Sequence, residues 1–158
     1  PRSTLFPYTT LFRSKKWLIS LGSPPFFFTW ASKFLSWFYP ISFLLLLTGL
    51  IWGIGFAPSD YKQGEVYRII FIHVPSAILG QSVYLMMAIF GSICLIWRAK
   101  LAGMFLRSAA PLGASFTLIA LVSGAVWGKP TWGTWWVWDA RLTSTLILFF
   151  LYAGIIVR

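Results

Sequence analysis

The chain has 158 residues, of which 58% are hydrophobic and 10% are charged, and it carries a formal net charge of +10. Its mean hydropathy of +0.78 is far above that of soluble globular domains, so the composition indicates an integral membrane protein with a single domain. The lysines and arginines are scattered between apolar runs and form no basic stripe or nucleic-acid-binding motif, so no nucleic-acid partner is expected.

The N-terminal segment, residues 1–36, is predicted to lie on the cytoplasmic side and at the membrane interface. Its first 14 residues, "PRSTLFPYTTLFRS", resemble translated sequencing-library adapter and are interpreted as a sequence artefact. Residues 24–38, "PPFFFTWASKFLSWF", are rich in aromatic side chains but contain Lys33 and two prolines. This mixture favours an interfacial segment over a further membrane span.

Four apolar runs follow, each long enough to cross or nearly cross a hydrocarbon core of about 30 Å as a helix. The runs comprise residues 38–56, 75–97, 102–126 and 142–157. They predict an all-α integral membrane protein, a bundle of four transmembrane helices within a membrane domain of residues 37–158. Gln81 and Thr117, polar side chains within two of the runs, are expected to donate hydrogen bonds between helices rather than to contact a ligand.

The charges predict the orientation, because short loops rich in lysine and arginine remain in the cytoplasm. With the N-terminus inside, most cations lie on the cytoplasmic side. The outer side then holds all the acidic residues and the remaining cations, namely Asp60, Glu65, Asp139, Lys62, Arg68, Lys129 and Arg141. The predicted topology is N-in and C-in, with outer loops at residues 57–74 and 127–141.

Local signals predict where these outer loops begin and end. Gly128 and Pro130 are expected to end the third span, because proline removes a backbone donor and disfavours helix at the preceding residue. Pro75 is expected in the first turn of the second helix. Asp139 is expected to have a structural role, as a cap of the fourth helix, a partner of Arg141 or an acceptor for an indole N–H.

Five of the ten tryptophans lie in the second outer loop, at positions 127, 132, 135, 136 and 138. One interpretation is an interfacial belt, since indole rings favour the headgroup level of a bilayer. Their density in one loop, together with Gly128 and Gly133, favours a stacking platform for a planar, largely apolar ligand.

His73 is the only histidine and is predicted on the same side of the membrane as the tryptophan-rich loop. It is either a hydrogen-bonded histidine at a helix end or an axial ligand to haem iron. Because the sequence has no CxxCH motif, covalent attachment of haem is excluded and any haem would be bound non-covalently. Lys62, Arg68, Lys129 and Arg141 are candidate partners for haem propionates, although each could instead contact lipid headgroups.

Three stretches carry a family resemblance. They are "WGKPTWGTWWVWDARLTS" (127–144), "GFAPSDYKQGEVYRIIFIHVPSA" (55–77) and "APLGASFTLIALVSGAVWGKP" (110–130). The first resembles the WWD motif of haem-handling proteins of cytochrome c maturation. All three together resemble the cytochrome c maturation protein C family, also called haem exporter protein C, over about residues 37–157.

The resemblance implies a multi-pass protein of the bacterial inner membrane whose WWD loop faces the periplasm. It implies that haem b is held there non-covalently and delivered to a haem chaperone, cytochrome c maturation protein E. An ATP-binding-cassette complex of the same system and membrane lipid are the other implied partners. By the resemblance His73 is an axial ligand of the haem iron, and further cofactor-binding residues are Trp127, Trp132, Gly133, Trp135, Trp136, Trp138, Asp139 and Arg141.

Family members continue through two more helices, with a second axial histidine in the outer loop between them. The chain is therefore expected to be a truncated fragment of a six-helix parent. No catalytic arrangement is present in the sequence, so the protein is not expected to be an enzyme. Two alternatives remain: a haem-exporting transporter (permease) subunit, ranked lower because the spans carry few ionisable groups, and a structural membrane scaffold without haem.

Overall fold

The computed structural model describes residues 23–157, and within this range it contains four long helices and no strand. The helices are α2 (Pro24–Ile51), α3 (Ile70–Trp97), α4 (Lys100–Trp132) and α5 (Ala140–Val157). A short π-helix, η1 (Trp52–Phe56), extends α2, and a 3-10 helix, η2 (Glu65–Ile69), leads into α3. The segment interpreted as an artefact, residues 1–14, lies outside the described residues. The described part of the chain confirms the predicted all-α membrane bundle.

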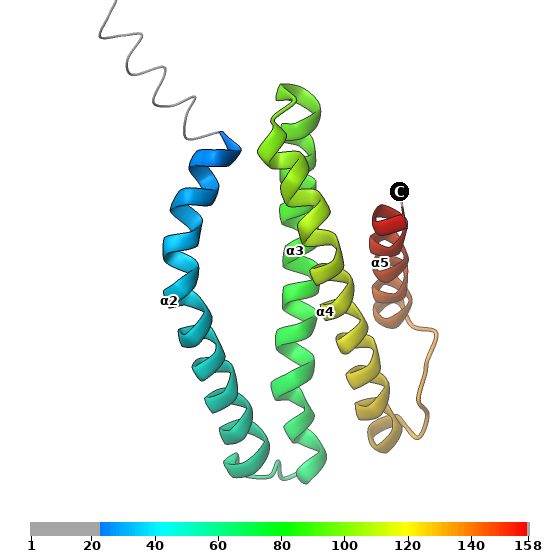
Figure 1. Ribbon diagram of the computed structural model, residues 1–158. Coiled ribbons are helices and arrows are strands. Elements are labelled where there is room, and N and C mark those ends of the chain that lie inside the picture. The colour runs from blue at the N-terminus through cyan, green and yellow to red at the C-terminus, as the bar shows by residue number, and fades with distance from the viewer. Residues whose placement is uncertain (1–22, 158) are drawn as a thin grey trace, which may run out of the picture.

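All four helices are long and apolar enough to cross a membrane. α2 with η1, α3 with η2, and α4 alone each have 33 residues and rise about 50 Å. In contrast, α5 has 18 residues and rises about 27 Å. Only α5 therefore has a length close to the hydrocarbon thickness of about 30 Å. Figure 1 shows the consequence: α5 begins partway along α4.

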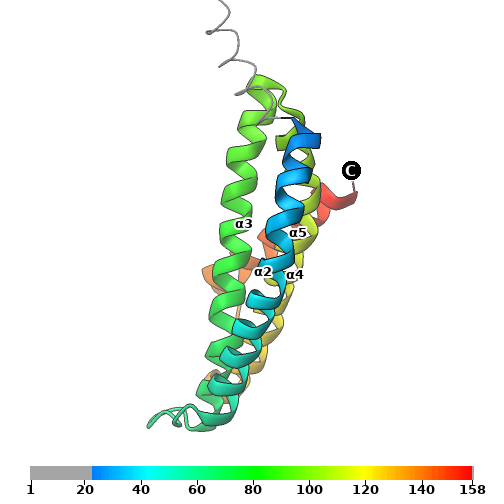
Figure 2. The same cartoon turned by 60° about the vertical axis from the view of Figure 1, so that its left-hand side comes forward.

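The core lies where α3, α4 and α5 meet, whereas α2 has no buried residue and stands beside them (Figures 1 and 2). Small residues on α4, among them Ala109, Ala110 and Gly113, allow its neighbours to approach closely. Tyr152 of α5 is fully buried in this space, and its ring occupies the position that a Cβ atom at Gly113 would need. Glycine at position 113 is therefore what admits the tyrosine.

The first helix begins earlier than the sequence indicated. Residues 24–38, predicted as a separate interfacial segment, form the N-terminal half of α2, with Pro24 and Pro25 in its first turn. Prolines are tolerated there because the first amides of a helix have no intrahelical acceptor. The boundary that the sequence indicated at residue 37 consequently lies inside one continuous helix.

The prediction that Gly128 and Pro130 end the third span is wrong, because α4 continues through both and ends at Trp132. Near a helix end, proline removes only one hydrogen bond, and the turn that follows can stop the helix instead. Gly133 adopts a left-handed conformation with φ 78°, and its amide donates to the carbonyl of Lys129 at 3.0 Å. Trp127 and Trp132 are therefore helical, and the non-helical connection is confined to residues 133–139.

The prediction that Pro75 lies in the first turn of its helix is also wrong. α3 begins at Ile70 and is preceded by η2, so Pro75 lies inside the helix and His73 lies in its first turn. The non-helical part of the first outer loop is accordingly reduced to residues 57–64. A turn closes this loop, in which Asp60 Oδ1 accepts hydrogen bonds from the amides of Lys62 and Gln63.

Hydrogen bonds test two further predictions, one for Asp139 and one for Thr117. Asp139 accepts a hydrogen bond from the Leu142 amide at 2.8 Å and pairs with Arg141 at 3.0 Å, so the predicted cap and ion pair are confirmed. The prediction that Thr117 hydrogen-bonds between helices is wrong, because its hydroxyl donates to the Gly113 carbonyl of its own helix at 2.8 Å.

Candidate functional site

A cavity of about 410 Å³ lies between α3, α4 and α5, toward the end of the bundle where α4 runs into the connection of residues 133–139. Its apolar wall is formed by Ala77, Ala120, Leu121 and Leu148. The loop of residues 57–64 and all three helices also contribute polar side chains to the lining. These are Gln63, His73, Gln81, Thr117, Thr131, Arg141, Ser144 and Thr145. The cavity therefore suits a ligand that is largely apolar but carries a few polar groups.

His73 projects from α3 and is held by residues of one α4 turn. Its Nδ1 atom lies 3.1 Å from Ser123 Oγ, within hydrogen-bond distance. A Cβ atom at Gly124 would lie 3.0 Å from His73 Cε1, so any larger residue would push the ring a few tenths of an ångström away from α4. Trp127 meets the imidazole edge to face, with ring centroids 5.6 Å apart. The half-buried imidazole therefore has a defined orientation on the cavity wall.

Trp127 also connects α4 to the loop of residues 57–64. Its indole Nε1–H donates a hydrogen bond of 2.8 Å to Gln63 Oε1 in the turn of residues 57–64. Both residues line the cavity. This hydrogen bond therefore holds the first outer loop against α4 beside His73.

Arg141 and Trp132 form the part of the cavity wall nearest the connection. The Arg141 guanidinium lies 5.5 Å from the Trp132 ring centroid and pairs with Asp139. The Leu142 amide, followed by Arg141, lowers the pKa of the Asp139 carboxyl by hydrogen bonding to its charged form. Asp139 thereby remains ionised and holds Arg141 beside Trp132.

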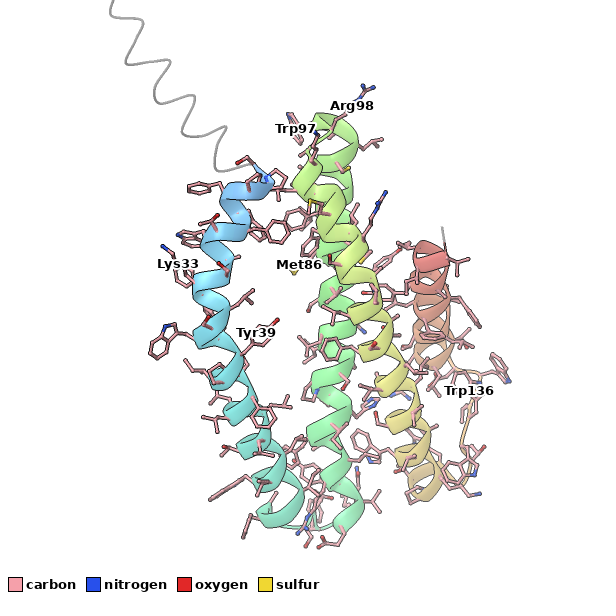
Figure 3. All side chains as sticks on the ribbon, in the orientation of Figure 1. Lys33, Tyr39, Met86, Trp97, Arg98 and Trp136 are labelled. Carbon is pink, nitrogen blue, oxygen red and sulfur yellow. The ribbon has the colours of Figure 1, made fainter. Side chains whose placement is uncertain are left out.

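The remaining tryptophans of the WWD motif lie in the connection and do not line the cavity. Trp136 and Trp138 contact each other edge to face at 5.4 Å, and Lys129 Nζ lies 6.0 Å from the Trp135 ring. Trp138 is 76% exposed, whereas the Nε1–H of Trp136 is buried without a hydrogen-bond partner among the described residues. Figure 3 places Trp136 on the α5 side of the bundle, opposite α2.

The predicted site residues thus fall into two groups. His73, Trp127, Trp132 and Arg141 share the cavity wall, whereas Gly133, Trp135, Trp136, Trp138 and Asp139 form the connection beside it. The connection turns away from α4 at Gly133, and this left-handed turn determines which tryptophans leave the cavity.

The four cations predicted as anion partners are also separated by the fold. Arg68 donates to the carbonyls of Ile54 and Ala57 at 2.8 and 2.9 Å, so it joins η1 to η2. Lys129 donates to the Gly133 carbonyl at 3.1 Å. Lys62 lies over the Tyr61 ring. Of these four residues, only Arg141 lines the cavity.

Three contributors were missed from the sequence: Gln63, Ser123 and Gly124. Ser123, Gly124 and Trp127 have the spacing i, i+1 and i+4, which places them on neighbouring positions of one helical face. That spacing is a usable signal once Trp127 is known to be helical. Gln63 carries no comparable signal, because its contact depends on the turn made by Asp60.

The residues present fit a haem-like ligand better than a bare metal ion. Within residues 23–157, no group of three or more His, Cys, Asp or Glu side chains could hold a metal ion. A lone imidazole can nevertheless ligate a metal whose other ligands come from a macrocycle. The apolar wall and Arg141 match a flat porphyrin with acidic side groups.

Comparisons with known proteins identify a family for this chain. Residues 17–157 match the model of the family described as "Heme exporter protein C". The haem exporter protein C of Escherichia coli (strain K12) is 52% identical over 141 residues, which cover 89% of this chain and 58% of the relative. Its counterpart in Haemophilus influenzae is 48% identical over the same share of this chain and 57% of the relative. A cytochrome c biosynthesis ccmC-like mitochondrial protein of Marchantia polymorpha is 47% identical over 82% of this chain and 58% of the relative. The chain thus spans somewhat more than half the length of these relatives.

Proposed function

Because the chain belongs to the haem exporter protein C family, we propose that it holds haem b non-covalently at the outer surface of a bacterial inner membrane. In this proposal the haem is presented on the WWD segment and delivered to a haem chaperone, cytochrome c maturation protein E. An ATP-binding-cassette complex of the same system is the second proposed partner, in keeping with the exporter name of the relatives. The protein acts as a carrier and not as an enzyme.

One observation carries the proposal: the sole histidine lies edge to face with Trp127 on the wall of a largely apolar cavity. Bound haem would supply an iron centre that accepts a neutral imidazole nitrogen as an axial ligand. His73 is the residue that would provide this nitrogen. The rings of Trp127 and Trp132 would cover part of the macrocycle, since indole faces pack well on flat apolar surfaces.

Arg141 is the proposed partner of a haem propionate, because it lines the cavity and its planar guanidinium can donate to both oxygens of a carboxylate. Its ion pair with Asp139 keeps the guanidinium at the cavity edge beside Trp132. Asp139 would repel a propionate directly, so its proposed role is to position Arg141 and to cap α5.

The connection of residues 133–139 is the proposed contact with the chaperone and with lipid headgroups. Trp138 is 76% exposed, and the indole N–H of Trp136 has no hydrogen-bond partner among the described residues. Exposed indoles such as that of Trp138 are features that a partner can use, whereas the buried Trp136 N–H would become available only if the connection rearranged. Trp135, Trp136 and Trp138 would thus face the recipient while Trp127 and Trp132 face the haem.

Absorbance spectroscopy of the chain in lipid nanodiscs tests the proposal. Titration with haem should produce a shifted Soret band, and His73→Ala should weaken binding about tenfold or more. Trp97→Ala is the matched control for loss of an aromatic ring, because Trp97 is 69% exposed at the C-terminal end of α3, far from the cavity. A Soret band that is absent, or that is the same for wild type and His73→Ala, would overturn the proposal.

A further inference from the structure

We infer that Ser123 fixes the tautomer of His73, so that Nδ1 carries the ring proton and Nε2 presents its lone pair to the cavity. The inference deepens the proposed function in one respect only: if haem is the ligand, Nε2 is the atom that binds its iron. Ser123 would then be a positioning residue that acts through His73 without touching the haem.

The Ser123 hydroxyl already donates its only proton to a backbone carbonyl of its own helix. Its oxygen lies 2.6 Å from the Ile119 carbonyl and 3.3 Å from the Ala120 carbonyl. A carbonyl can only accept, so the single hydroxyl proton is committed to the shorter contact, as is common for serine within a helix. The hydroxyl therefore has lone pairs but no proton left for the imidazole.

The imidazole of His73 must therefore supply the proton of its contact with Ser123. His73 Nδ1 lies 3.1 Å from the same hydroxyl oxygen, and the Ala120 carbonyl beside that hydroxyl also accepts a hydrogen bond from the ring. A neutral imidazole has one N–H and one bare nitrogen, and a bare Nδ1 facing a lone pair would form no hydrogen bond. The contact is satisfied only when Nδ1 carries the proton and donates to Ser123 Oγ. Nε2 is then the bare nitrogen.

Neighbouring residues keep the ring against α4. Gly124 allows Cε1 to approach α4 so closely that a Cβ atom there would lie 3.0 Å away. Trp127 meets the imidazole edge to face from the next turn. The ring is thus held beside Ser123, and the hydrogen bond to Ser123 Oγ selects the nitrogen that faces α4.

The choice of a hydroxyl also affects how strongly Nε2 can bind. A carboxylate accepting from the second ring nitrogen raises the basicity of a metal-bound histidine. None of the acidic residues in the described range lines this cavity. A neutral acceptor such as Ser123 orients the ligand with less added electron density, which suits a carrier that must release its cargo.

Nitrogen NMR of the haem-free chain tests the assignment directly. His73 is the only histidine, so labelling with ¹⁵N-histidine produces signals from one imidazole ring. In nanodiscs, at a pH well above the ordinary histidine pKa of about 6.5, wild type should show a protonated Nδ1 and an unprotonated Nε2. Ser123→Ala should shift the population toward protonated Nε2, and Ser123→Thr should restore the wild-type pattern.

Ser115→Ala provides the matched control. Ser115 lies on the same helix and donates to the Pro111 carbonyl at 2.8 Å, but it is exposed and does not line the cavity. Its removal should leave the ring signals unchanged. With haem added, Ser123→Ala should weaken binding by about 10- to 100-fold, and Ser123→Thr should bind like wild type.

The outcomes separate the inference from the proposed function. A wild-type ring with protonated Nε2, or a tautomer unchanged in Ser123→Ala, overturns the inference even if haem binds. A wild-type ring with protonated Nδ1 and no haem binding overturns the proposed function and leaves the tautomer assignment intact. If Ser123→Ala fails to fold, the wild-type spectrum alone decides the tautomer.

Discussion

The phenol oxygen of Tyr152 donates a hydrogen bond of 2.7 Å to the backbone carbonyl of Gly80, which joins α5 to α3 past the small residues of α4. Tyr152 is completely buried, and its ring also contacts Tyr84 edge to face. Neither Tyr152 nor Gly80 lines the cavity, so substitutions at Tyr152 test the packing of the three helices.

Tyr152→Phe should destabilise the bundle by about 1 kcal/mol, because it removes the hydroxyl and leaves the Gly80 carbonyl with one partner fewer in an apolar setting. Unfolding by titration with denaturing detergent, followed by circular dichroism, measures the change. A phenylalanine variant as stable as wild type would show that the hydrogen bond contributes nothing net.

Gly113→Ala should be more damaging, with a loss of about 1–3 kcal/mol, because the new methyl group would overlap the Tyr152 ring. Gly154→Ala is its matched control in α5, since nothing lies within 4 Å of a Cβ atom there. Alanine is the better helix former, so this control should be neutral or slightly stabilising. Equal losses from the two substitutions would contradict the packing described for Tyr152.

Trp127→Phe should release the first outer loop while keeping a ring against His73, because it removes only the indole donor to Gln63. Hydrogen–deuterium exchange of residues 57–64 should become faster. Gln63→Ala should accelerate it to the same extent, and the double variant should add nothing further, as expected when one interaction is removed twice. Additive effects would mean that the two residues act independently.

Asp139→Asn should change how stability depends on pH. The pKa of Asp139 is lowered in the folded chain, chiefly by the Leu142 amide and then by Arg141. Its stabilising effect is therefore fully present above the unfolded pKa of about 4 and is lost as the pH falls through the lower folded pKa. Melting temperatures measured across acidic pH should converge for wild type and Asp139→Asn. Parallel curves would contradict a role for the charge.

Cysteine labelling should test the proposed orientation. In a Cys94→Ser background, Thr134→Cys lies in the tryptophan-rich connection and Lys100→Cys lies at the opposite end of α4, and both positions are exposed. A membrane-impermeant maleimide added to intact spheroplasts should label only Thr134→Cys. Labelling of Lys100→Cys alone would reverse the proposed topology.

The number and type of the helices could be predicted from the sequence, because hydrophobic runs of sufficient length leave the backbone little choice in a bilayer. The ends of the helices could not. Pro130 and Pro75 are ordinary helix-boundary signals, yet both lie inside helices, since the stop at Gly133 and the early start at Ile70 depend on the wider fold.

The candidate site was predictable to a similar degree. The shared side of His73 and the tryptophans followed from charge, because positive loops define the cytoplasmic face. The division of the tryptophans did not, because it depends on the helical phase of Trp127 and on the turn at Gly133. Gln63 and Ser123 were missed because polar side chains of these types are common at positions without any functional role.

The unequal lengths of α4 and α5 have one more consequence. α4 is about 22 Å longer than α5 and reaches past it at both ends in Figure 1, so residues 133–139 must return along α4 to reach the start of α5. The aromatic segment of residues 133–139 then spans the depth of the lipid headgroups. A ligand bound beside this segment would meet water along one edge and acyl chains along the other. Such an environment suits a flat molecule whose acidic groups all lie on one side.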